Sequence, residues 1–206
     1  MSLLLLLLLA TPLAPIDSTH VYYASKDTAS LTSLLQQAET REDDLLCRYR
    51  LYPLTQESAL IRDLPRGLDD GTARELALLA GLWGYRAGEA SFPASIRHGL
   101  RSQGLLDEAV ALDADDPLVL LVEGQSLMFK PRIAGGNAEE ALARFQRLRE
   151  VIRTSRQPAV APLEADLWIW YALYKLKRDE APTLRADLLA QNDLPLLYRE
   201  FLNDPP

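Results

Sequence analysis

The feature that most constrains this chain is a recurrence of apolar residues with a period of about 3.6, which runs from about Lys26 onward. Pro, Gly and Asp interrupt the recurrence at short intervals, and almost no run of residues favours a strand. A typical segment, SLTSLLQQAE, places Leu31, Leu34 and Leu35 on one face of a helix. Because short connections join consecutive amphipathic helices, we expect an all-α fold of roughly ten helices in antiparallel hairpins.

Several helix ends are also visible in the sequence. In TREDDLLCRYRLY, Thr40 is placed as an N-cap with Asp43 three residues later, and we expect this helix to end before Pro53. The segment ASIRHGLRSQGLLDEAVALDADDP predicts a long helix that stops at the Asp-rich turn before Pro117. The helix predicted for ARELALLAGLWGYRAG carries small residues that allow a neighbour to approach closely, namely Ala77, Ala80, Gly81 and Gly84.

The N-terminus resembles a secretory signal peptide. Seven leucines, Leu3 to Leu9, form a run too short to cross a bilayer, and small residues follow it. The segment departs from the pattern because no Lys or Arg precedes the leucines and Pro15 follows Ala14 directly. We expect a leader over residues 1–18 and one domain over 19–206, which is periplasmic or secreted and has no transmembrane segment. A wrongly assigned start and a cytoplasmic protein stay open as the alternative.

Composition narrows the classes of function. The 29 acidic and 22 basic side chains give a net charge of -7, which argues against nucleic acid as a partner. The single cysteine, Cys47, cannot form an internal disulfide and is predicted to be a buried, inert thiol. With two histidines and no carboxylates at ligand spacing, we expect no metal and no cofactor. No catalytic motif occurs, so we expect a protein that is not an enzyme.

The segment DEAVALDADDPLVLLVEGQSLMF, followed by GGNAEEALARFQRL, resembles the tetratricopeptide repeat. The positions that match its small and large residues are Ala109, Gly124, Ala141, Phe145 and Leu148, and residues 113–117 match its turn. A looser copy spans 168–190, and the whole resemblance covers about residues 74–202. The loop before Gly135 is longer than the standard turn, and Ala114 stands where Pro is usual. The pattern is also similar to a family of secreted bacterial repeat proteins. The resemblance implies helical hairpins stacked as a right-handed array.

The loop MFKPRIAGGNAEEAL has two interpretations, a phosphate-binding loop or a turn between helices. A phosphate loop of the Walker type follows a strand and ends in Gly-Lys-Ser/Thr, whereas this one follows a predicted helix and ends in Gly-Gly-Asn. Gly135 and Gly136 permit positive φ, and Asn137 is placed to cap the next helix with Glu140 at its third position. The sequence therefore favours the turn.

The repeat resemblance also implies a partner-binding groove on the concave face. First helices of such repeats line that face, and Trp168 is the aromatic residue that we expect to face the groove. An adaptable Met, an amide and an aromatic ring with basic groups at the rim suit an extended or helical peptide that bears acidic residues. The residues predicted to bind the partner are Leu121, Gln125, Met128, Lys130, Arg132 and Trp168.

Two functions follow from this interpretation. The first is a non-catalytic helical-repeat scaffold that mediates protein–protein interaction in the cell envelope. The second is a periplasmic accessory component of a solute transporter that binds a small ligand, because helical-repeat components of tripartite periplasmic transporters have a similar layout. The sequence does not distinguish a peptide from a small molecule, and it leaves the oligomeric state open.

Overall fold

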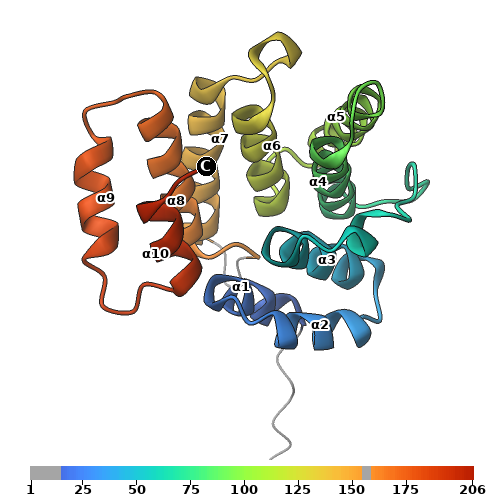
Figure 1. Ribbon diagram of the computed structural model, residues 1–206, viewed down its shortest axis with the longest axis horizontal. Helices are drawn as coiled ribbons and strands as arrows, with labels where there is room; N and C mark the ends of the chain where they lie inside the picture. Colours follow the sequence, from blue (N-terminus) through green and yellow to red (C-terminus); the bar gives the residue numbers. More distant parts are fainter. Residues whose placement is uncertain (1–14, 155–158) are drawn as a thin grey trace, which may run out of the picture.

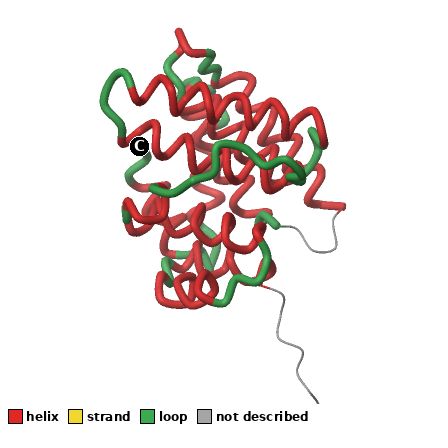
Figure 2. Tube along the Cα trace, turned by 90° about the vertical axis from the view of Figure 1, so that its right-hand side faces the viewer, coloured by secondary structure: helices red, strands yellow, loops and turns green. Residues whose placement is uncertain are grey.

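The expected all-α fold is confirmed. A computed structural model describes residues 15–154 and 159–206, and these residues contain ten α-helices, two 3-10 helices and no strand (Figure 2). The α-helices are α1 (Pro15–Ser25), α2 (Thr28–Gln36), α3 (Arg41–Thr55), α4 (Ala73–Glu89), α5 (Ala94–Leu112), α6 (Pro117–Phe129), α7 (Ala138–Thr154), α8 (Pro162–Lys175), α9 (Ala181–Leu189) and α10 (Leu196–Asn203). The 3-10 helices are η1 (Ser58–Ile61) and η2 (Arg132–Ala134).

Consecutive helices pack as hairpins, and the series bends until its two ends meet. The pairs α2 and α3, α4 and α5, α6 and α7, and α8 and α9 are in contact, and α4 and α7 join neighbouring pairs (Figure 1). Helix α10 turns back across α8 and α9 and also reaches α1. There the Lys26 ammonium lies 2.7 Å from a carboxylate oxygen of Glu200. Stacking of the tetratricopeptide type, and its hand, stay predictions.

The local signals for helix ends are confirmed except at Pro53. The hydroxyl of Thr40 accepts a hydrogen bond from the Asp43 amide at 3.1 Å, so Thr40 is the N-cap of α3. Helix α3 continues through Pro53 to Thr55, and the prediction that it ends earlier is wrong. Proline lacks an amide hydrogen and its ring crowds the preceding helical turn. Pro53 lies in the last turn of α3, which still closes because the Gln56 amide bonds the Tyr52 carbonyl at 2.9 Å.

The described chain begins with a helix that the sequence did not predict. Helix α1 starts at Pro15, inside the segment expected to be a leader, and residues 1–14 lie outside the described part. Thr19 and Ala24 of α1 are buried, and Tyr23 packs against the core. The helical pattern therefore starts before Lys26. The apolar side chains of this segment do not form a clear stripe.

Small residues let helices approach closely where the sequence predicted it. A Cβ on Gly124 of α6 would overlap the ring of Phe145 in α7, and a Cβ on Gly81 of α4 would overlap the ring of Tyr49 in α3. Both aromatic rings are buried. These glycines therefore set the spacing of two helix pairs, through close approach rather than backbone freedom.

Candidate functional site

The α6–α7 loop is a turn, as the sequence favoured. The side-chain oxygen of Asn137 accepts hydrogen bonds from the amides of Glu139 and Glu140 at 3.1 and 3.4 Å. Gly135 adopts a φ of 92°, but Gly136 does not adopt positive φ. Gly136 is needed for a different reason, because a Cβ there would collide with the main-chain carbonyl of Lys130. Gly135, Gly136 and Asn137 therefore shape the turn and begin the next helix.

The six residues predicted to bind a partner do not form one exposed surface. Leu121 is fully buried, and Met128 is half-buried against the core. Gln125 accepts a hydrogen bond from the Tyr49 hydroxyl, while Arg132 is exposed at the tip of the loop.

The surroundings of Lys130 and Trp168 also differ from those that the sequence predicted. The Lys130 ammonium donates to the side-chain oxygen of Gln103 in α5, so it joins the loop to α5 and is half-buried. Trp168 does not face a groove, because only 8% of it is exposed and its indole stacks on Phe145 at 5.6 Å. Sequence spacing placed Trp168 on the right helix but did not show that other aromatic rings cover it.

An aromatic cluster covers Trp168 and joins three helices. The centre of the Trp168 ring lies 6.0 Å from that of Phe129 in α6 and 5.4 Å from that of Phe201 in α10. Tyr171, one turn along α8, lies 6.1 Å from Phe129 and 5.1 Å from Phe201. Phe129 is 55% exposed. We call Phe129, Trp168, Tyr171 and Phe201 the aromatic face.

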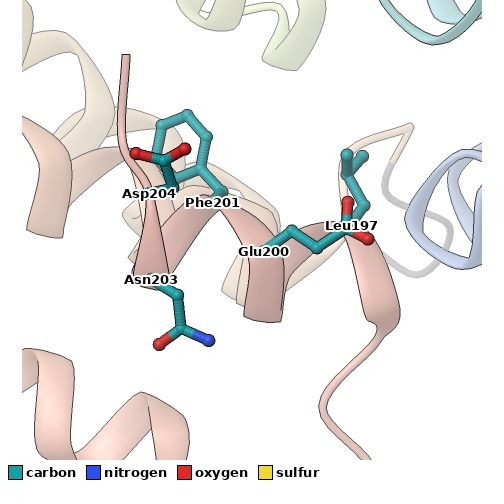
Figure 3. A pocket seen from close by; sticks show the side chains of 5 residues that line it. All are labelled: Leu197, Glu200, Phe201, Asn203 and Asp204. Atoms are coloured by element: carbon teal, nitrogen blue, oxygen red, sulfur yellow. The ribbon is translucent and has the colours of Figure 1, made fainter.

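A shallow hollow on α10 adjoins the aromatic face. Figure 3 shows that Leu197, Phe201 and Asp204 project from one side of α10, while Asn203 points to the other. Glu200 completes the lining of the hollow. The lining combines apolar carbon with two carboxylates and the Asn203 amide.

Residues that follow α10 contact the aromatic face. Beyond α10 the backbone bends away from the helix at Asp204, with φ -139° and ψ 75°. The main-chain oxygen of Pro206 accepts hydrogen bonds from the Tyr171 hydroxyl at 2.5 Å and from the Lys175 ammonium at 3.1 Å. The same ammonium lies 5.3 Å from the centre of the Tyr171 ring. Tyr171 and Lys175 therefore already bind a main-chain oxygen of the chain itself.

The sequence prediction missed Phe129, Tyr171, Lys175 and Phe201. Only Phe201 carried a usable signal, because it lies four residues after Leu197 on the apolar side of a short amphipathic helix. Tyr171 belongs to a helix that is apolar nearly all round, so its hydroxyl could not be assigned a direction. Phe129 is the last residue of α6, where an apolar residue gives no periodic signal.

Neither a reactive cysteine nor a metal site is found among the described residues. Cys47 is fully buried, and burial raises the pKa of its thiol to about 12, as its predicted inertness requires. In residues 15–154 and 159–206, no three His, Cys, Asp or Glu side chains gather where they could hold a metal ion. The aromatic face instead exposes the ring of Phe129, whereas Trp168 and Tyr171 are buried. The Tyr171 hydroxyl and the Lys175 ammonium bind a main-chain oxygen, which is an element of peptide recognition.

Comparisons of the chain with protein-family models, with curated proteins and with solved structures gave no match. Within the described residues, each helix is too short or too polar to span a bilayer. The functional assignment therefore rests on the geometry of the aromatic face.

Proposed function

We propose that this protein is a non-catalytic helical scaffold that binds an extended segment of a partner protein on its aromatic face. The observation that carries the proposal is the position of residues 204–206, whose main-chain oxygen at Pro206 is held by Tyr171 and Lys175. A partner segment would displace this oxygen and take the same two donors. The exposed ring of Phe129 would then cover an apolar side chain of that segment.

The chemistry of the surface defines the partner. Aromatic rings contribute large contact area at little cost in side-chain entropy, and they dominate binding energy at protein interfaces. The Lys175 ammonium favours a segment that also carries a carboxylate near the bound main-chain oxygen. The expected ligand is thus a short extended peptide with one apolar and one acidic residue.

The proposal includes a location in the cell envelope and a tetratricopeptide-like arrangement of the helices. The leucine run at residues 3–9 supports export to the periplasm or beyond, where the scaffold would act in the cell envelope. The hairpin order of the helices supports a tetratricopeptide-like arrangement. Curved helical arrays of this kind expose an inner surface long enough for an extended peptide.

A library of random peptides displayed on phage tests the proposal. Peptides selected on the natural chain would be synthesised, and their affinity measured by fluorescence anisotropy. We expect Phe129→Ser to lower the affinity about tenfold or more, because it removes the exposed anchor. Tyr174→Ser is the matched control, since Tyr174 is 49% exposed and lies outside the aromatic face.

Stability must be measured alongside affinity, because Phe129 also touches Trp168. Urea unfolding of Phe129→Ser should differ little from that of Tyr174→Ser. The proposal fails if no peptide is selected, or if selected peptides bind the two variants equally well.

A further inference from the structure

Helix α5 carries an apolar stripe that no described part of the chain covers. Phe92, just before the helix, and Ile96 and Leu100 within it follow one another at intervals of four residues, and all are exposed. Leu100 alone is 69% exposed. The buried residues of α5, which include Leu105 and Leu106, lie on another side and pack mainly on α4, whereas contact with α6 is sparse.

Two glycines border this stripe and leave the backbone bare. Gly99 and Gly104 have no neighbouring atom within 4 Å of the position that a Cβ would occupy. Glycine lowers helix stability at such positions. No contact within the described chain explains why glycine occurs at both of them. A bare glycine next to an exposed leucine permits another helix to approach closely.

Basic residues lie in the first half of α5 and acidic residues in the second, which is unfavourable for its helix dipole. Arg97 and Arg101 lie in the first half, and Asp107 and Glu108 lie in the second. The dipole favours the reverse order, and α5 has no acidic residue in its first turn and no basic residue in its last. Among the described ion pairs, none includes Arg97, Arg101 or Glu108.

We infer that the stripe of α5 binds a second copy of this chain in an antiparallel pair. In such a pair each helix presents its basic first half to the acidic second half of the other, so the charge pattern is complementary to itself. A two-fold axis level with residues 102 and 103 sets Leu100 against the bare backbone of Gly104 in the partner copy. Arg97 then lies beside Glu108 of that copy. Each contact occurs twice, as in an isologous interface.

This inference is independent of the proposed peptide site, which lies on α6, α8 and α10. Sedimentation equilibrium of the full chain over a roughly hundredfold range of concentration tests it by mass action. We expect a reversible dimer, and Leu100→Asp should raise its dissociation constant at least about tenfold, because a carboxylate replaces the central apolar contact. Leu112→Asp is the control, since Leu112 is 61% exposed on the same helix but off the stripe.

Charge reversal distinguishes this antiparallel pairing from other contacts. Arg97→Glu and Glu108→Arg should each weaken the dimer, and the double variant Arg97→Glu/Glu108→Arg should restore it. A monomer at every concentration overturns the inference, as does a dimer that Leu100→Asp leaves intact. Binding of the natural chain to vesicles of anionic lipid, lost in Leu100→Asp while the chain stays monomeric, would assign the stripe to a membrane surface instead.

Discussion

Arg50 of α3 and Glu164 of α8 form a two-pronged ion pair in the interior, between residues 114 positions apart in the chain. The two guanidinium nitrogens lie 2.5 and 3.0 Å from the two carboxylate oxygens. Only 1% and 2% of the two side chains are exposed. The Arg50 guanidinium also lies 4.7 Å from the centre of the Tyr23 ring in α1. The ion pair and the Tyr23 ring therefore connect α1, α3 and α8.

Removal of one member of this pair should be strongly destabilising. Glu164→Ala leaves the Arg50 charge buried without its partner, which typically costs about 3–5 kcal/mol. Replacement of both charges by apolar side chains of similar size, as in Arg50→Met/Glu164→Leu, avoids that cost, so the double variant should be more stable than Glu164→Ala. Urea unfolding followed by circular dichroism measures both. A loss below about 1 kcal/mol in Glu164→Ala would show that water reaches the pair.

Alkaline pH should destabilise the fold in part through Tyr23. Burial raises the pKa of Tyr23 from 10.0 to about 12, although the neighbouring Arg50 acts in the opposite direction. The folded state thus keeps a proton that the unfolded state releases, so stability falls as the pH rises from about 10 toward 12. Two pKa units correspond to at most about 2–3 kcal/mol. Tyr23→Phe should flatten the decline of the unfolding free energy over this range. An identical decline in both proteins would mean that Tyr23 does not contribute.

Cys47 should react with iodoacetamide only when the chain unfolds. The thiol is fully buried, and burial raises its pKa from 9.0 to about 12, with Asp43 and Asp44 adding to the shift. At pH 8 the folded chain therefore contains almost no thiolate and gives the reagent no access. Mass spectrometry should show an unmodified native protein and complete alkylation in denaturing urea. Rapid alkylation of the native protein would place Cys47 at the surface.

Features that depend on a few neighbouring residues could be predicted from the sequence. Thr40 and Asn137 cap their helices because a short polar side chain reaches an amide two or three residues later, and no other part of the chain takes part. The small residue at Gly124 was also recognisable, because helix spacing repeats along a hairpin series. Fold class and most helix positions follow from local interactions of this kind.

Features that depend on distant segments could not be predicted. Arg50 and Glu164 lie on helices whose contact is decided by the bend of the whole array, so neither residue signals its partner. Trp168 was assigned to the surface because periodicity orients a side chain on its own helix but does not show whether Phe129 and Phe201 cover it. The exposure of Leu100 on α5 likewise required the structure.

The spacing of α6 and α7 should be sensitive to one methyl group. Gly124→Ala places a Cβ where the Phe145 ring now lies, so the helices must separate or the ring must move. Overpacking of a buried contact costs about 1–3 kcal/mol, which exceeds the gain of up to about 1 kcal/mol that alanine brings to a helix. Gly88→Ala in α4 is the matched control, because no atom lies within 4 Å of that position and the same substitution should stabilise the fold. Urea unfolding should show a lower free energy of unfolding for Gly124→Ala and a higher one for Gly88→Ala. In Gly124→Ala/Phe145→Leu the smaller side chain should reduce the cost of overpacking. If Gly124→Ala stabilises the chain as much as Gly88→Ala does, α6 and α7 are not in the close contact described.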